Sequence, residues 1–151
     1  MEGEAVKIPD HERAYQGLRE MVLYGELAPG EPVTIQGLTE RVGLGMTPVR
    51  EAIRRLTSQG ALVFKGNRRV VVPELTLEQY GELAFVRRRV EPELARRSVE
   101  NMEEEHIIRL AAEDAAVDDA IEKGDVRGYL EHNHRFHETL YALSGAEVLL
   151  T

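Results

Sequence analysis

Residues 47–60 read TPVREAIRRLTSQG, and the order of residue types predicts one short helix. Thr47 is a favourable N-cap, and Pro48 suits the first helical position because its missing N–H needs no partner there. Gly60 is suited to ending the helix. Apolar residues recur at helical spacing from Val49 to Leu56, so one face can be buried. The opposite face carries Arg50, Arg54 and Arg55.

Two further helices are expected before this one. An apolar stripe predicts the first over Glu12–Leu27, and the breakers Ala28-Pro29-Gly30 end it. Thr34 can cap a shorter second helix with Leu38 facing inward. The glycines within residues 43–45 predict a tight turn into the third helix, which is the spacing of a helix-turn-helix.

A basic hairpin is expected directly after the third helix. Leu62–Phe64 and Val70–Val72 are β-type runs, and the residues between them read KGNRR. A Gly-Asn pair between two such runs is a hairpin turn signal. Three helices followed by a basic hairpin predict a winged helix-turn-helix over residues 10–73.

Charge is distributed unevenly along the chain. The net charge is −8, but residues 10–73 hold nine Lys/Arg against seven Asp/Glu, whereas residues 74–151 hold nine against eighteen. Such a division suits a protein whose first domain alone meets phosphate. The chain has no cysteine, which excludes disulfides and thiolate metal sites, and no apolar run long enough to span a membrane. We therefore expect a cytoplasmic protein with no membrane partner.

The third helix and the hairpin are the candidate contacts for duplex DNA. A recognition helix enters the major groove with its N-terminal residues nearest the base edges. The hairpin tip is expected against the backbone or over the minor groove. Each cation alone is more typical of a solvated surface, but their grouping favours DNA. The candidate contacts are Gln36, Met46, Thr47, Arg50, Arg54, Lys65, Gly66, Asn67, Arg68 and Arg69.

The acidic half of the chain begins with a long helical pattern. Thr76 and Gln79 can form a capping box that opens a helix. Pro92 lies within the pattern, so we expect a kink or a short break near Glu91. The side chains expected to face the interior are Leu77, Tyr80, Leu83 and Ala84.

Two more helices are expected after it. The acidic run Glu103–Glu105 suits the positive end of a helix, which Gly124 ends. Asp125 can cap a third helix that runs to about Leu143. The inward stripe of the first of these helices is Ile107, Leu110, Val117 and Ile121. The fold class is therefore mainly α, with a helical domain over residues 74–151.

A pair of polar residues lies inside the apolar arc of the last helix. Successive helical residues turn by about 100°, which places Asn133 and His137 in the middle of an arc of Tyr129, Leu130, Phe136, Leu140 and Tyr141. Buried polar groups need partners. Spacing alone favours hydrogen bonds to each other or to a neighbouring helix, while a shared metal ion is the alternative. His132 and His134 fall at the edges of the arc and are expected at the surface.

The first half of the chain resembles the GntR family of bacterial regulators. The motifs are GELAPG at 25–30, LTE at 38–40 and TPVREAIRRL at 47–56, within a match over residues 12–73. The resemblance implies DNA contacts by Thr47, Arg50 and the hairpin tip at Gly66. Met46 and Gln36 stand where the family has arginines, and Arg69 replaces a hairpin glycine. The operator sequence therefore does not follow from the resemblance.

The second half is similar to the FCD effector domain of the FadR subfamily. The similarity covers residues 76–149 and rests on Val86-Arg87 with Glu91, NHRFH at 133–137, Leu140, and Ser144-Gly145. It implies a helical bundle in which an Asp or Asn and three histidines hold a divalent metal of the zinc, nickel or manganese class, which helps bind a small organic acid. Asn133 and His137 would be the first two ligands.

The resemblance also implies that the chain is truncated within the FCD domain. The other two histidines of the family would lie beyond Thr151. We therefore expect the metal to be absent or its site incomplete in this chain, and a large apolar face to be uncovered.

These observations predict a sequence-specific regulator that binds double-stranded operator DNA as a homodimer and responds to an organic-acid effector. Catalysis is not expected, because the sequence has no nucleophile beside a base and no phosphate-binding glycine loop. Two alternatives remain open. One is a metal-dependent helical enzyme or metal-binding module with a degenerate winged helix, and the other is a winged helix used for protein contact.

Overall fold

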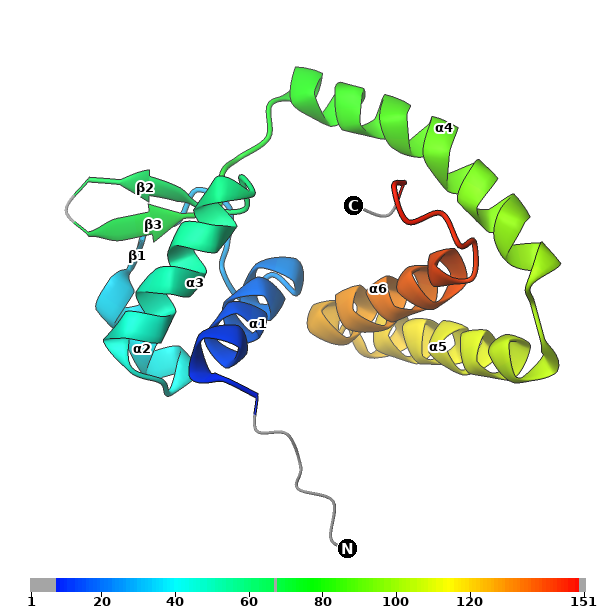
Figure 1. Cartoon of the computed structure of the whole chain (residues 1–151), viewed down its shortest axis with the longest axis horizontal. Helices are drawn as coiled ribbons and strands as arrows, with labels where there is room; N and C mark the ends of the chain where they lie inside the picture. The colour runs from blue at the N-terminus through cyan, green and yellow to red at the C-terminus, as the bar shows by residue number, and fades with distance from the viewer. Residues whose placement is uncertain (1–7, 67, 150–151) are drawn as a thin grey trace, which may run out of the picture. The chain divides into compact units, whose positions relative to one another are not determined.

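The computed structural model describes residues 8–66 and 68–149. The chain is mainly helical, which confirms the predicted fold class, and it divides between Glu74 and Leu75 into two compact units (Figure 1). Among the described residues, no helix has both the length and the apolar character needed to cross a membrane.

The first unit consists of three helices and a small antiparallel sheet. The helices are α1 (Asp10–Leu23), α2 (Ile35–Val42) and α3 (Met46–Ser58). The strands β1 (Val33–Thr34), β2 (Val63–Lys65) and β3 (Arg69–Val71) pair in the order β1-β3-β2. The expected hairpin is β2 and β3, in which Phe64 pairs with Val70. Strand β1 was not expected from the sequence, because two residues are too few to show the alternation of a strand.

The core of this unit confirms the apolar face of the third helix. Val49, Ala52, Ile53 and Leu56 of α3 are all buried. They pack with residues of α1, α2 and the sheet, among which Leu18, Leu38, Leu62 and Val70 are buried. Burying this face directs the charged side of α3 away from the core.

Two helix boundaries in this unit differ from the prediction. Helix α1 ends at Leu23 instead of Leu27, because Gly25 takes a left-handed conformation with φ 73°. Leu27 is buried outside the helix, and its N–H donates to the Met21 carbonyl at 3.1 Å.

The cap of α3 is Gly45, not Thr47. The Val49 N–H donates to the Gly45 carbonyl at 3.3 Å, so the first turn begins before the predicted cap. Thr47 and Pro48 lie within that turn, where backbone N–H groups have no intrahelical acceptor in any case.

The second unit contains α4 (Leu77–Glu100), α5 (Glu104–Lys123) and α6 (Val126–Ala142). The α4 capping box is confirmed: Thr76 Oγ1 accepts from the Gln79 N–H at 3.2 Å, and Gln79 Oε1 accepts from the Thr76 N–H at 2.9 Å. Asp125 caps α6 by accepting from the Gly128 N–H at 3.0 Å. Helices α5 and α6 lie side by side (Figure 1).

Two features of this unit differ from the sequence-based expectations. Of the kink or short break expected near Glu91, the break is absent, because α4 continues through Pro92 as one helix. Much of the stripe expected inside is exposed, with Leu77 at 87% and Ile121 at 59%. Tyr80, Leu83 and Ile107 are exposed as well. The buried residues of α4 are Leu94 and Ser98, so contact with α6 is made by its C-terminal half. An apolar stripe shows which side of a helix can be buried, but not whether another element covers it.

Candidate functional sites

The N-terminal ends of α2 and α3 and the hairpin tip meet around a hollow in the surface of the first unit. Its volume is about 260 Å³, and it is lined by Thr34, Ile35, Gln36, Met46, Arg50 and Arg68. Met46, Thr47 and Arg50 are exposed at the start of α3. The structure thus brings together residues from three separate segments that the sequence analysis named as DNA contacts.

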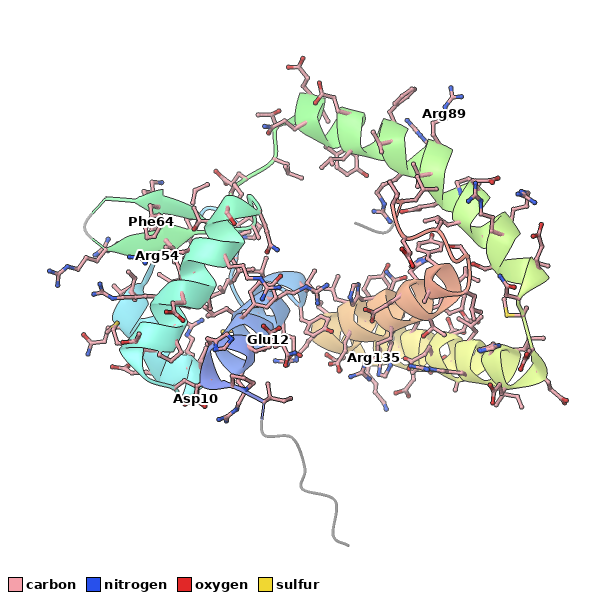
Figure 2. All side chains as sticks on the ribbon, in the orientation of Figure 1. Asp10, Glu12, Arg54, Phe64, Arg89 and Arg135 are labelled. Carbon is pink, nitrogen blue, oxygen red and sulfur yellow. The ribbon has the colours of Figure 1, made fainter. Side chains whose placement is uncertain are left out.

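The cations of α3 and the hairpin are available for an external partner. In the part of the chain that the structure describes, the following side chains have neither a hydrogen bond nor an ion pair: Arg50, Arg54, Lys65, Arg68 and Arg69. All five are exposed. Figure 2 shows these side chains as sticks, with Arg54 of α3 and Phe64 of β2 labelled.

Arg55 differs from these cations. Its Nη1 donates to Glu12 Oε2 at 3.0 Å, and its guanidinium carbon lies 3.6 Å from the centre of the Tyr15 ring. Both partners belong to α1 (Figure 2 labels Glu12). Of the three arginines predicted to form a cationic face, Arg50 and Arg54 have no partner among the described residues, whereas Arg55 joins α3 to α1.

The hairpin tip is tied to the start of α2. Arg68 has φ 59°, a conformation that is costly for a residue with a side chain. The Ile35 N–H donates to the Arg68 carbonyl at 3.2 Å, and the Arg69 N–H donates to the Gly66 carbonyl at 3.2 Å. These bonds hold the tip beside the hollow. Asn67, another predicted contact, lies outside the described residues.

Gln36 and Met46 each contact a neighbour on α2. Gln36 Nε2 donates to Glu40 Oε1 at 3.2 Å. Met46 Sδ lies 3.7 Å from the Thr39 hydroxyl oxygen, which is itself 2.8 Å from the Ile35 carbonyl oxygen. The two side chains that line the hollow are thus oriented by α2.

The polar pair of α6 is half-buried. Neither Asn133 nor His137 forms a hydrogen bond with another described residue, and His137 Nδ1 is buried without a partner. The His137 ring lies 5.5 Å from the Phe136 ring and 5.3 Å from the Tyr141 ring, centre to centre. Burial raises the pKa of the Tyr141 phenol, and the Glu91 carboxylate raises it further.

His132 is not the surface residue that the sequence suggested. Its Nδ1 lies 2.8 Å from Glu113 Oε2, and both side chains are partly buried. This contact joins α5 to α6. The helical wheel alone could not show it, because the partner lies on another helix.

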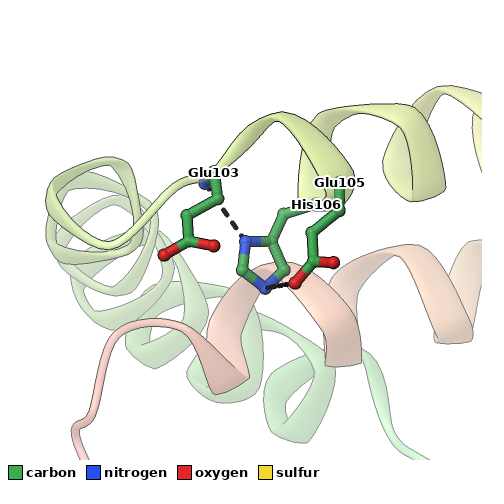
Figure 3. A group of neighbouring side chains, drawn as sticks. All are labelled: Glu103, Glu105 and His106. Carbon is green, nitrogen blue, oxygen red and sulfur yellow. Dashed lines mark hydrogen bonds and ion pairs between the residues drawn. The ribbon is translucent and has the colours of Figure 1, made fainter.

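A group of Glu103, Glu105 and His106 stands at the start of α5 (Figure 3). His106 Nδ1 accepts from the Glu103 N–H at 3.1 Å, so it completes the helix cap, and its Nε2 is 3.9 Å from Glu105 Oε1. An accepting Nδ1 places the ring hydrogen on Nε2. Capping and the positive end of the helix account for this group without a metal.

Two family models match the chain. The model of the bacterial regulatory proteins of the gntR family matches residues 10–72, and the model of the FCD domain matches residues 82–151. The matches coincide with the two halves in which the predicted DNA contacts and the polar pair lie.

Curated relatives are regulators of transcription. The chain is 30% identical over 132 residues to the HTH-type transcriptional regulator McbR of Escherichia coli strain K12, which covers 87% of this chain and 60% of that protein. It is 24% identical over 140 residues to the HTH-type transcriptional repressor RspR of the same strain, which covers 93% and 61%. The chain therefore spans about three fifths of the length of these relatives.

Solved structures share the fold. E. coli McbR/YncC matches with a TM-score of 0.87 at 28% identity, over 95% of this chain and 68% of that one. A Rhodococcus sp. RHA1 protein assigned to the GntR regulators matches with a TM-score of 0.69 at 24% identity, over 92% and 66%. The curated relatives are named as regulators of transcription, which argues against the metal-dependent enzyme considered above.

Proposed function

We propose that the chain is a sequence-specific regulator of transcription, because residues 10–72 match the gntR family of bacterial regulatory proteins and residues 82–151 match the FCD domain. It binds double-stranded operator DNA through α3 and the β2–β3 hairpin. The observation that carries the proposal is that α3 and the hairpin hold five exposed cations that have no hydrogen bond or ion pair with any described residue. Their side chains lose no internal contact when they bind phosphate.

The hairpin and α3 are suited to different contacts with DNA. Exposed cations on the hairpin suit phosphate contacts, which position a protein on DNA and release counterions. The start of α3 suits base contacts, because N-terminal residues of a recognition helix lie nearest the base edges. Thr47 and the free N–H groups of the first turn of α3 add a place for a phosphate. Arg50, on the rim of the hollow, can reach a guanine edge.

The regulator acts as a homodimer on an operator with two-fold symmetry. One short helix and one hairpin give a small interface, and two copies double it with half-sites at a defined spacing. Helix α4 offers exposed apolar side chains for association, namely Leu77, Tyr80, Leu83, Phe85 and Val86. Several exposed large apolar side chains on one helix suit contact with another protein surface.

The helical unit receives a small organic acid together with a divalent metal of the zinc, nickel or manganese class. The buried, unpartnered Nδ1 of His137 fits a metal ligand, and Asn133 offers an amide oxygen one turn earlier on α6. Such an ion would supply positive charge for a carboxylate. Both side chains are neutral, so an ion held there needs further ligands besides these two. Because bacterial DNA lies in the cytoplasm, a protein that binds operator DNA works there.

A salt-dependent titration of duplex DNA tests the DNA-binding role. Arg50→Ala is expected to weaken binding to the operator by roughly 1–3 kcal/mol if Arg50 contacts a base, with a smaller loss on random duplex. The matched control is Arg109→Ala, which removes an exposed cation from α5 in the other unit. Equal affinity of the wild type and the Arg50 variant for both duplexes would refute the assignment of α3 as the reading helix.

A further inference from the structure

The hollow beside α3 combines an apolar wall with one oriented amide. Ile35 and Met46 provide the apolar wall, and Gln36 stands next to them at the start of α2. Met46 is 39% exposed, so its thioether side chain faces the hollow and solvent instead of the core. An apolar side chain at the tip of a recognition helix can contact a base but cannot form a hydrogen bond of consequence with it.

The orientation of the Gln36 amide follows from its neighbour. The Glu40 carboxylate only accepts hydrogen bonds, so the amide nitrogen of Gln36 must face it, at 3.2 Å. The amide oxygen then points away from Glu40 and is free to accept, and the second N–H of the nitrogen is free to donate. An acceptor beside a donor matches the N6–H and N7 of adenine in the major groove. Guanine presents two acceptors there and does not match.

Met46 is suited to recognising thymine, the partner of adenine in an A·T pair. Thymine alone among the four bases carries a 5-methyl group in the major groove, and apolar side chains recognise it by contact. The contact between Met46 Sδ and the Thr39 hydroxyl, at 3.7 Å, restricts the flexible thioether to the hollow. The hollow, at about 260 Å³, has room for a methyl group at its apolar wall.

We infer that Gln36 and Met46 form a reader of A·T base pairs, in which Gln36 binds the adenine edge and Met46 contacts the thymine methyl group. The inference rests on the proposed DNA-binding function and adds its specificity. Glu40 and Thr39 are positioning residues, because they orient the two readers without reaching the base. Arg50 lines the same hollow and is free to contact a neighbouring base or phosphate.

Selection from a random duplex library tests the base preference. The chain itself is expected to enrich A·T in each half-site, at a position where the double variant Gln36→Arg/Met46→Arg enriches G·C, because arginine pairs with guanine O6 and N7. The same base at that position for both proteins would overturn the inference. If the chain enriches no sequence at all, the proposed function fails with it, which is a separate and recognisable result.

Removal of single methyl groups from the selected operator tests the role of Met46 directly. Replacing thymine by deoxyuridine at that position in one half-site is expected to weaken binding about fourfold, the equivalent of one buried methyl group. The loss should vanish in Met46→Ala and persist in the matched variant Met46→Leu, which keeps an apolar contact. A loss of equal size in Met46→Ala, or none in the wild type, would show that Met46 does not contact the methyl group while leaving operator binding itself intact.

Discussion

The guanidinium carbon of Arg55 stands 3.6 Å from the centre of the Tyr15 ring, and its Nη1 donates to Glu12 at 3.0 Å. Arg54, the preceding residue, has no such contact among the described residues. The two adjacent arginines thus have different roles. Arg55 fastens α3 to α1, and Arg54 is left for an external partner.

Replacing each of the two arginines by alanine should separate these roles. Arg54→Ala is expected to reduce the salt slope of DNA binding by about 1, as loss of a phosphate contact does, and to leave stability unchanged. Arg55→Ala should lower the free energy of unfolding of the first unit by about 0.5–1.5 kcal/mol, because it removes an exposed cation–π contact and an exposed ion pair. Fluorescence anisotropy and thermal unfolding measure the two effects. A loss of stability in Arg54→Ala, together with a reduced salt slope in Arg55→Ala, would contradict these roles.

Ser98 joins α4 to α6 and should be important for the stability of the helical unit. Its hydroxyl is fully buried and lies 2.8 Å from the Leu94 carbonyl oxygen and 2.5 Å from the Leu140 carbonyl oxygen. Ser98→Ala leaves the Leu140 carbonyl without this donor, at an expected cost of about 1–2 kcal/mol. Amide hydrogen exchange in α4 and α6 reports this loss. Ser58→Ala, which removes only an exposed bond within α3, is the control and should change exchange in these helices little.

Glu93 should titrate at unusually low pH. Hydrogen bonds from Arg96 and then Arg97 favour the ionised form and lower the pKa of the Glu93 carboxyl to about 2. A lowered folded-state pKa means that the stabilisation is complete above the ordinary carboxyl pKa, and it is lost as the pH falls toward 2. An NMR titration of the Glu93 side-chain carboxyl measures the value, and Arg96→Gln should raise it. A wild-type pKa near the ordinary value of 4.5 would contradict these contacts.

His137 should be needed for metal binding by the protein. Its buried Nδ1 has no partner among the residues described, so an ion would satisfy it. His137→Ala is expected to lower the metal content measured by mass spectrometry, while operator affinity in the absence of effector stays unchanged. His134→Ala, on the same helix, is the control and should retain the metal. Wild-type protein purified without metal, even after incubation with zinc, nickel or manganese, would rule out this role.

The amino-acid sequence by itself determined the winged helix and most of the surface predicted to bind DNA. Breakers, caps and the 3.6-residue period of α3 are local properties, so TPVREAIRRL predicted the buried face from Val49 to Leu56 and the cations opposite. Thr76, Gln79 and Asp125 predicted helix starts correctly for the same reason, because a cap satisfies backbone groups only two or three residues away. The sequence showed that Gln36 and Met46 stand where the family has arginines, but it did not show that the two side chains lie beside one hollow.

Tertiary structure alone decided which side chains find partners on other elements. It separated Arg55 from Arg54 through α1, paired His132 with Glu113 across two helices, and placed Gln36, Met46 and Arg68 around one hollow. It also left Leu77 exposed on a face with the pattern of a buried one. Periodicity gives the direction of a side chain around its own axis, whereas burial and pairing depend on what lies opposite, at distances in sequence that no local pattern spans.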